Sequence, residues 1–146
     1  MAPECPFCRL AEAPEDLVFS DAETFAFLDH RPVFPGHTLV VPRAHHETLA
    51  DLPAGLIEPV FRNVQLLAQA VEQAMEAEGT FVAINNKVSQ SVPHLHVHVV
   101  PRRRKDGLRG FFWPRVPYAS DQERDEFAAR IAAALPAAAG TAPPAA

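Results

Sequence analysis

The chain has little that would direct it to a membrane or to nucleic acid. It contains no apolar run near the ~20 residues of a spanning helix. Its start, Met-Ala-Pro-Glu-Cys, lacks the basic and then apolar segment of a signal peptide. Its formal net charge is −5, so the overall field does not favour nucleic acid or anionic lipid. We therefore expect a cytoplasmic protein without membrane association, and we do not expect nucleic acid as its partner.

Cysteine is also scarce, since only Cys5 and Cys8 occur, in the sequence Cys-Pro-Phe-Cys. In a reducing compartment this spacing indicates a metal knuckle or a redox pair rather than a structural disulfide. A redox pair of the thioredoxin type would lie between a strand and a helix, whereas no strand precedes Cys5. The motif therefore predicts a metal site, with two idle thiols as the alternative.

Histidine, by contrast, is concentrated in one place. His94, His96 and His98 alternate with Leu and Val, and a β-strand would place all three imidazoles on one face. Imidazole can attack, exchange a proton near neutral pH or bind metal. Two other interpretations are a half-buried strand with a polar outer face and a metal-binding histidine tract. Because neither explains three histidines among branched apolar residues, the row predicts a reaction surface.

The remaining pattern predicts one α+β domain over residues 1–135. The chain has 146 residues, of which 48% are hydrophobic and 21% charged, as in ordinary globular proteins. We expect an antiparallel sheet with helices on one face, and a disordered Ala/Pro-rich tail over residues 136–146. The expected strands are residues 16–20, 24–29, 37–42, 80–85 and 92–101. The expected helices are a long one over residues 52–79, capped by Asp51, and a last one after Ser120 with Phe127, Ile131 and Leu135 on one side.

Two segments resemble the histidine triad (HIT) family. Gln90-Ser-Val-Pro-His-Leu-His-Val-His-Val-Val100 is similar to the family's signature, and Phe27-Leu-Asp-x-x-Pro-Val-x-Pro-Gly-His-Thr-Leu-Val-Val-Pro42 is similar to its nucleotide-binding segment. The resemblance covers about residues 4–105. It implies a HIT-like antiparallel sheet with one long central helix, a homodimer, and a nucleotidyl hydrolase or transferase that acts at the α-phosphate.

The same resemblance assigns roles to the histidines and their neighbours. His96 would attack the α-phosphorus and form a nucleotidyl-imidazole intermediate, and its other nitrogen then needs a hydrogen-bond acceptor that fixes the tautomer. His98 would bind the phosphate and handle the proton of the leaving group, and His37 matches the fourth histidine beside the triad. Gln90 and Ser91 would donate hydrogen bonds to the phosphate and leaving oxygen.

Two further residues match the family's substrate contacts. Asp29 corresponds to the position that holds the ribose hydroxyls, and Asn85 to an asparagine near the phosphate. Outside these motifs, Asn85, Gln90 and Ser91 would read as turn formers and Asp29 as a strand-end carboxylate. One departure from the family is the loop of residues 86–89, which is shorter than usual and contains no glycine to let backbone amides approach a phosphate. Lys87 is an alternative source of positive charge there.

The resemblance also completes the metal site. Some bacterial HIT proteins pair a CxxC motif with two histidines, and the matching positions are His45 and His94, with His46 as the competitor of His45. Cys5, Cys8, His45 and His94 would then hold a structural Zn²⁺, which takes four N or S ligands. In that case the metal holds His94, and only His96 and His98 act on phosphate.

The predicted function is therefore hydrolysis of a purine nucleoside 5′-phosphate derivative, such as a dinucleoside polyphosphate or a nucleoside phosphoramidate. The alternatives are a nucleotidyltransferase or phosphorylase, and a nucleotide-binding module with incidental catalysis. A basic and aromatic segment over residues 102–115 either grips an anion or forms a solvated turn with packed aromatic residues.

Overall fold

The computed structural model describes residues 4–109 and 115–136. The chain divides into two units, Met1–Asp106 and Gly107–Ala146. The predicted tail lies outside the described residues except for Pro136, and so do the aromatic residues of the predicted basic and aromatic segment, Phe111, Phe112 and Trp113.

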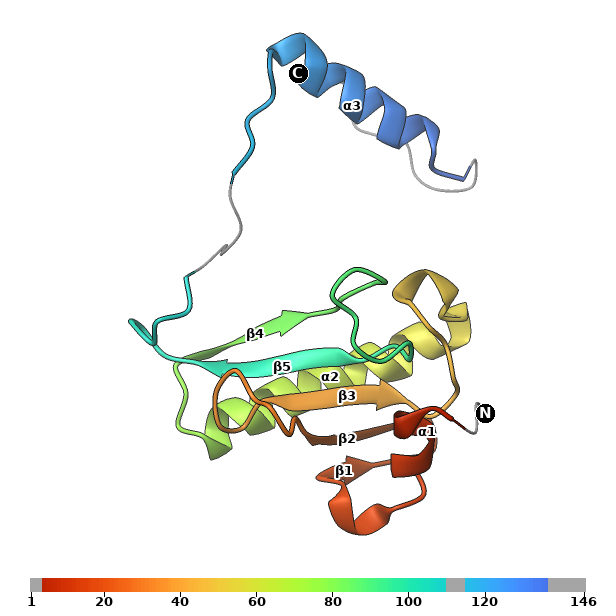
Figure 1. The fold of residues 1–146 in the computed structure, drawn as a ribbon, viewed down its shortest axis with the longest axis vertical. Helices are drawn as coiled ribbons and strands as arrows, with labels where there is room; N and C mark the ends of the chain where they lie inside the picture. Colours follow the sequence, from red (N-terminus) through yellow and green to blue (C-terminus); the bar gives the residue numbers. More distant parts are fainter. Residues whose placement is uncertain (1–3, 110–114, 137–146) are drawn as a thin grey trace. The chain divides into compact units, whose positions relative to one another are not determined.

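The first unit is built on a five-stranded antiparallel sheet, which confirms the α+β class (Figure 1). The strand order is β1-β2-β3-β5-β4, so β3 and β5 are neighbours in the interior of the sheet. The strands are β1 (Phe19–Ser20), β2 (Thr24–Leu28), β3 (Thr38–Pro42), β4 (Gly79–Ala83) and β5 (Val97–Arg102). The predicted hairpin is present, because β4 and β5 pair antiparallel with Ala83 opposite His98.

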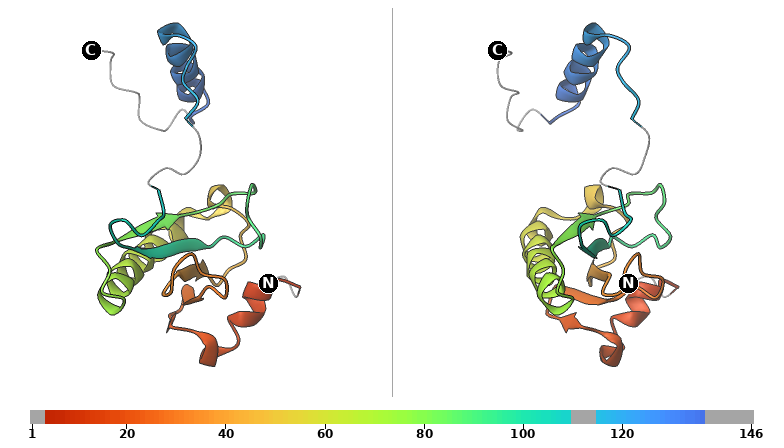
Figure 2. Two further views of the ribbon diagram at one scale, coloured as in Figure 1. Left: turned by 60° about the vertical axis from the view of Figure 1, so that its left-hand side comes forward. Right: turned by 90° about the vertical axis from the view of Figure 1, so that its left-hand side faces the viewer.

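One face of the sheet is covered by the long helix α2 (Ala54–Ala74) (Figure 2). Its buried side chains recur at helical spacing and pack against alternate residues of the strands, which forms the main core. This core includes Val60, Val64, Leu67 and Val71 of the helix and Ala26, Val40, Leu95, Val97 and Val99 of the sheet side.

The helix is shorter than predicted at both ends. It ends at Ala74, and Gly79 is the first residue of β4 rather than the helix terminator. Asp51 does not cap it. Instead, its carboxylate accepts hydrogen bonds from the backbone N–H and the hydroxyl of Thr48, which caps the 3₁₀ turn η2 (Leu49–Asp51). Asp51 therefore stabilises the 3₁₀ turn that precedes the helix and not the start of the helix itself.

The other face of the sheet carries a second apolar cluster, so the expectation of helices on one face only was incomplete. The short helix α1 (Pro6–Leu10) lies there, and Cys5, Phe7 and Cys8 pack with side chains of β2 and β3. The sequence between the cysteines contains only Pro and Phe, and Phe7 is buried in this cluster. The CxxC motif is thereby anchored against the sheet.

Two strand predictions began too early. Residues 14–16 form the 3₁₀ turn η1 (Pro14–Asp16), and β1 starts only at Phe19. β5 starts at Val97, so His94 and His96 precede the strand instead of lying in it. The alternation nevertheless holds, because Leu95, Val97 and Val99 belong to the core on the α2 face, whereas the rings of His94 and His96 contact Phe7.

The second unit contains the helix α3 (Asp121–Ala133), which begins as predicted, since the Ser120 hydroxyl accepts a hydrogen bond from the backbone N–H of Glu123. None of the helices in the described ranges combines the length and apolar character needed to cross a bilayer.

Candidate functional site

The side chain of His96 is held in one tautomer. Its Nδ1 lies 2.7 Å from the backbone carbonyl oxygen of His94, and a carbonyl can only accept, so Nδ1 carries the proton. Nε2 therefore keeps its lone pair. The residue is 4% exposed, and the Phe7 ring packs edge-on against it at 5.1 Å. This is the state that a nucleophilic imidazole needs.

A chain of hydrogen bonds fixes the tautomer of His98 as well. The backbone N–H of Val33 donates to His37 Nδ1 at 3.1 Å, so the proton of His37 is on Nε2. That N–H lies 3.0 Å from His98 Nδ1 and donates to it. The proton of His98 is then on Nε2, and this buried atom has no hydrogen-bond partner within the described residues. A buried N–H beside His96 that no described group accepts could donate a hydrogen bond to an anion.

The surroundings favour the neutral forms of His98 and His37. Burial, together with the nearby His96 and His37, lowers the pKa of His98 to about 4, and Asp29 opposes this only in part. Burial also lowers the pKa of His37, whose Nδ1 lies 3.7 Å from a carboxylate oxygen of Asp29. An approaching phosphate would favour uptake of one proton by this histidine pair.

The lowered pKa of His98 has a measurable consequence for stability. An unfolded histidine titrates near pH 6.5, so the unfolded chain takes up this proton before the folded one does. The contribution of His98 is therefore complete above about pH 6.5 and is lost as the pH falls towards 4. Denaturant unfolding between pH 7 and 4.5 should show a steeper loss in the wild type than in His98→Asn, by up to about 1.4 kcal/mol per pH unit. Parallel curves would contradict the depressed pKa.

Asp29 lies between the histidines and a hollow of the surface. One carboxylate oxygen accepts a hydrogen bond from the backbone N–H of Arg31 at 2.9 Å, and the other faces His37. The hollow has a volume of about 440 Å³. It is lined by the end of α1, by the turn η1 and the residues between it and β1, and by the end of β2 with the two residues that follow, namely Leu10, Glu15, Asp16, Leu17, Val18, Phe27, Leu28, Asp29 and His30.

The loop before the histidines has a strained backbone. Lys87 and Ser89 have φ values of 67° and 61°, a left-handed conformation that glycine adopts at lower cost. Gln90 is engaged within the protein: its amide N–H donates to the carbonyl of Glu47 at 2.6 Å, and its Oε1 accepts from the backbone N–H of Lys87 at 2.8 Å. Asn85 and Ser91 are exposed at the two ends of the loop.

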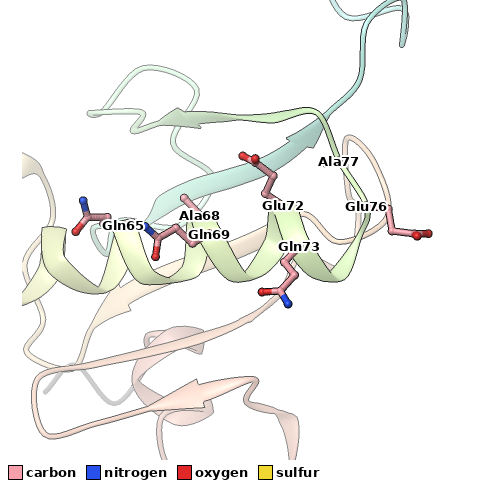
Figure 3. A pocket seen from close by; sticks show the side chains of 7 residues that line it. All are labelled: Gln65, Ala68, Gln69, Glu72, Gln73, Glu76 and Ala77. Atoms are coloured by element: carbon pink, nitrogen blue, oxygen red, sulfur yellow. The ribbon is translucent and has the colours of Figure 1, made fainter.

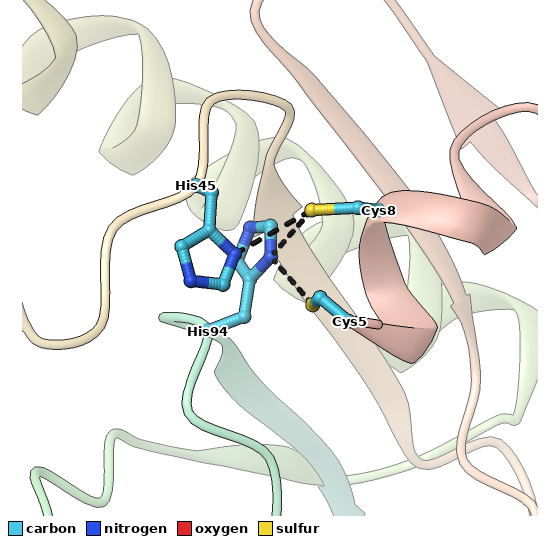
Figure 4. Close-up of side chains that lie close together, drawn as sticks. All are labelled: Cys5, Cys8, His45 and His94. Carbon is cyan, nitrogen blue, oxygen red and sulfur yellow. Dashed lines mark hydrogen bonds between the residues drawn. The ribbon is translucent and has the colours of Figure 1, made fainter. Parts of the chain in front are cut away.

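The second cluster of chemistry is formed by Cys5, Cys8, His45 and His94 (Figure 4), whose ligand atoms all lie within 4.8 Å of one another. His94 Nδ1 is 3.3 Å from Cys5 Sγ and 3.6 Å from Cys8 Sγ, and His45 Nδ1 is 3.4 Å from Cys8 Sγ. His45 belongs to this cluster, whereas His46 does not.

These four residues fit a tetrahedral zinc ion. Zn–S and Zn–N bonds of about 2.3 and 2.0–2.1 Å place neighbouring S and N ligands roughly 3.6 Å apart, which the three separations approach. His94 Nε2 lies 2.8 Å from the carbonyl oxygen of Pro42 and donates to it, so the lone pair of Nδ1 points at the thiols. Burial lowers the pKa of His94 to about 4, which keeps the imidazole in the neutral form that binds metal.

The sequence motifs did not reveal every group that shapes the site. Phe7 contacts the rings of both His94 and His96, and only its apolar character inside the CxxC motif hinted at burial. The Val33 amide and the Pro42 carbonyl are backbone groups, which no side-chain pattern could indicate. A proline beside each of them in the nucleotide-binding segment restricts the local backbone.

The basic part of residues 102–115 is engaged in the protein where it is described. Arg102 pairs with Asp106 at 2.6 Å, and Arg104 with Glu78 at 3.5 Å. Arg103 donates to the backbone carbonyl of Met75 at the end of α2. Arg103 and Arg104 therefore contact the turn that follows α2, and the choice between an anion site and a solvated turn stays a prediction, because the aromatic residues lie outside the described ranges.

Comparison with known proteins identifies the family. The model of the HIT domain matches residues 10–105, and the chain belongs to this family. The protein Hit of Bacillus subtilis is 35% identical over 116 residues, which cover 77% of this chain and 80% of that protein. A crystal structure of a HIT-family member from Bacillus subtilis has a TM-score of 0.81 and 30% identity, and the match covers 92% of this chain and 99% of that one.

Other relatives bear on chemistry. A zinc-bound histidine triad protein from Mycobacterium smegmatis matches with a TM-score of 0.67 and 32% identity over 90% of this chain and 98% of that one. Adenylylsulfatase HINT3 of Arabidopsis thaliana is 28% identical over 72% of this chain and 55% of that protein. The asymmetrical bis(5′-nucleosyl)-tetraphosphatase of Schizosaccharomyces pombe is 35% identical over 56% of this chain and 46% of that protein. The family thus includes hydrolases, and this chain spans about half of each of these two.

Proposed function

We propose that the protein hydrolyses nucleoside 5′-phosphate derivatives through a nucleotidyl intermediate on His96. The observation that carries this proposal is the pair of complementary tautomers: a lone pair on His96 Nε2 and a buried, unpaired N–H on His98. One ring can attack phosphorus while its neighbour, 5.0 Å away between ring centroids, holds the charge that develops on oxygen. The hydrolases named among the relatives support the same reaction class.

The steps follow from these two rings. When the substrate binds, its negative charge favours uptake of one proton by the His37–His98 pair, at His37 Nδ1 beside the Asp29 carboxylate and in place of the hydrogen bond from Val33. His96 Nε2 attacks the α-phosphorus and the bond to the leaving group breaks, and the leaving atom takes the proton of His98 Nε2 while His98 Nδ1 takes the Nε2 proton of His37. Water then attacks the phosphorus and gives a proton to His98 Nε2, His98 returns its Nδ1 proton to His37, and the P–N bond to His96 breaks. Further proposed phosphate contacts are Ser91, Asn85 and the second amide N–H of Gln90. His37 holds the ring of His98 in its orientation.

The hollow beside Asp29 suits the nucleoside. Its walls include exposed apolar side chains of Val18 and Leu28 together with Phe27, and a planar purine would cover them. The Asp29 carboxylate lies between this hollow and His37, where it can accept hydrogen bonds from two ribose hydroxyls.

Removal of the Asp29 carboxylate should weaken nucleotide binding selectively. We expect Asp29→Ala to raise the Kd for AMP about 10- to 100-fold, the value of one or two hydrogen bonds to a charged group. The variant should bind AMP and 2′,3′-dideoxy-AMP equally, whereas the wild type prefers AMP. Titration calorimetry with both ligands measures this. A variant that still prefers AMP would show that Asp29 does not hold the ribose.

We propose Zn²⁺ as the metal held by Cys5, Cys8, His45 and His94. All four positions are protein side chains, which is typical of a structural rather than a catalytic zinc site. The metal would join the N-terminal helix to the segment before the catalytic strand. The zinc-bound relative supports this assignment.

A homodimer remains a prediction that the exposed side chains of the first unit support. β4 is an edge strand with Val82 43% exposed. Ile57, Phe61 and Leu66 of α2 are 48%, 39% and 47% exposed. A hollow of about 440 Å³ also runs along α2, lined by side chains such as Gln65, Gln69 and Gln73 (Figure 3). The exposed apolar side chains of β4 and α2 are typical of surfaces that a partner covers, whereas the side chains that line the hollow are mostly polar.

A small panel of substrates separates the possible activities. We expect turnover of a dinucleoside polyphosphate, a nucleoside phosphoramidate or an adenylyl sulfate to give the nucleoside monophosphate in buffer without inorganic phosphate. A product that appears only when phosphate is added would indicate a phosphorylase. If the wild type and His96→Ala turn over every compound equally slowly, the protein is a nucleotide-binding module instead.

A further inference from the structure

The glycine-free loop of residues 86–91 is tied to the segment that follows the metal ligand His45. The backbone N–H of Leu49 donates to Asn86 Oδ1 at 2.9 Å, and Gln90 Nε2 donates to the carbonyl of Glu47 at 2.6 Å. One tie lies near each end of the loop. Both join it to residues 47–49, although 37 and 43 positions separate the partners in sequence.

The same segment is tied to the catalytic histidines. The backbone N–H of Leu95, between His94 and His96, donates to the carbonyl of His46 at 2.6 Å. His45 therefore stands at the start of a short stretch whose next backbone groups hold both the loop and the histidine row. A metal ion that fixes His45 against Cys8 also fixes the position of these groups.

The loop needs such support because its own conformation is unfavourable. Lys87 and Ser89 are in the left-handed region, which is unfavourable for a residue with a side chain. Gln90 Oε1 accepts a hydrogen bond from the backbone N–H of Lys87. The Gln90 side chain therefore both closes the turn within the loop and ties the loop to Glu47. Without the ties, the loop would relax and Ser91 would leave its position before the histidine row.

We infer that Asn86 and Gln90 are positioning residues that couple the metal site to the phosphate loop. Occupancy of Cys5, Cys8, His45 and His94 by zinc orders residues 46–49, and the two side chains transmit this order to residues 86–91. Metal binding thereby strengthens binding of the nucleotide phosphate without contact between metal and substrate. This coupling goes beyond the proposed function and rests on it for the identity of the ligand.

Amide hydrogen exchange tests the coupling independently of activity. In the zinc-loaded protein the amides of Leu49 and Lys87 should be protected, because each donates to a side chain of the loop. Asn86→Ala should raise their exchange at least about 10-fold, since one tie is lost. Asn86→Asp retains an acceptor oxygen and should restore protection. Gln73→Ala, an exposed change on α2, serves as the matched control and should leave both amides as in the wild type.

When a chelator removes zinc from the wild type, amide exchange in the loop should rise as it does in Asn86→Ala. When the chelator is added to the Asn86→Ala variant, exchange should rise little further. The Kd for AMP should rise about 10-fold in the same two states. Unchanged loop exchange in Asn86→Ala, or failure of Asn86→Asp to restore it, would overturn the coupling even if the stripped protein unfolds. If AMP fails to bind while the exchange pattern appears as expected, the proposed function falls together with the effect on nucleotide binding, and the coupling between the metal site and loop order stands.

Discussion

His96→Ala is expected to lower kcat/KM for any nucleotide substrate by about 10⁴-fold or more, the scale seen when a covalent nucleophile is removed. The reason is that neither neighbouring histidine can take its place. His94 presents its lone pair to the thiols, and His98 presents an N–H to the site. Neither ring has a nitrogen free to attack phosphorus. Single-turnover kinetics with a nucleoside phosphoramidate give the measurement.

The control is Gln122→Ala, an exposed change on α3, which should keep kcat within a few-fold of the wild type. The Kd for AMP should also change little in His96→Ala, because His98 and Asp29 remain. A His96→Ala protein that retains more than a few per cent of wild-type turnover would reject His96 as the nucleophile.

Cys5→Ser together with Cys8→Ser is expected to abolish zinc binding and to lower Tm by about 10 °C or more. Structural zinc contributes about 10–16 kcal/mol in small zinc-finger peptides. Here the core under α2 contains none of the four metal-site residues, so the variant should lose only part of such a contribution to the free energy of unfolding. One kcal/mol corresponds to roughly 2–4 °C for a protein of this size. Metal analysis and thermal unfolding of the purified variant measure both effects.

His46→Ala provides the control for this prediction, because His46 lies outside the cluster of ligand atoms and should retain zinc and Tm. His45→Ala should lose both. Undiminished zinc in the double serine variant would reject the metal site, and loss of zinc in His46→Ala but not in His45→Ala would reverse the choice of ligand.

The sequence predicted the residues that carry the chemistry of the site better than the contacts that hold them in place. Alternation of His with Leu and Val is a local pattern, and it separated the two faces correctly even though β5 begins only at Val97. The role of His37 could not come from spacing, since 61 residues separate it from His98, and it was reached through the family resemblance. The metal cluster was likewise predicted from residues whose proximity only folding creates.

The loop and the helix ends were harder to predict. The absence of glycine signalled a departure from the family, but the left-handed backbone of Lys87 and Ser89 depends on hydrogen bonds to a distant segment. Asp51 was assigned to the wrong helix because a capping signal fits either a 3₁₀ turn or the α-helix that follows it. Tertiary contacts decided the first case, and a local capping box decided the second.

The most direct test of the account is detection of the covalent intermediate. Wild-type protein mixed with a nucleoside phosphoramidate should be quenched within one turnover at alkaline pH, where a phosphorus–imidazole bond survives, and digested for peptide mass analysis. The account predicts a nucleotidyl group on His96 that is absent in His96→Ala and disappears as nucleoside monophosphate forms. Turnover without any adduct, or an adduct on a residue other than His96, would contradict it.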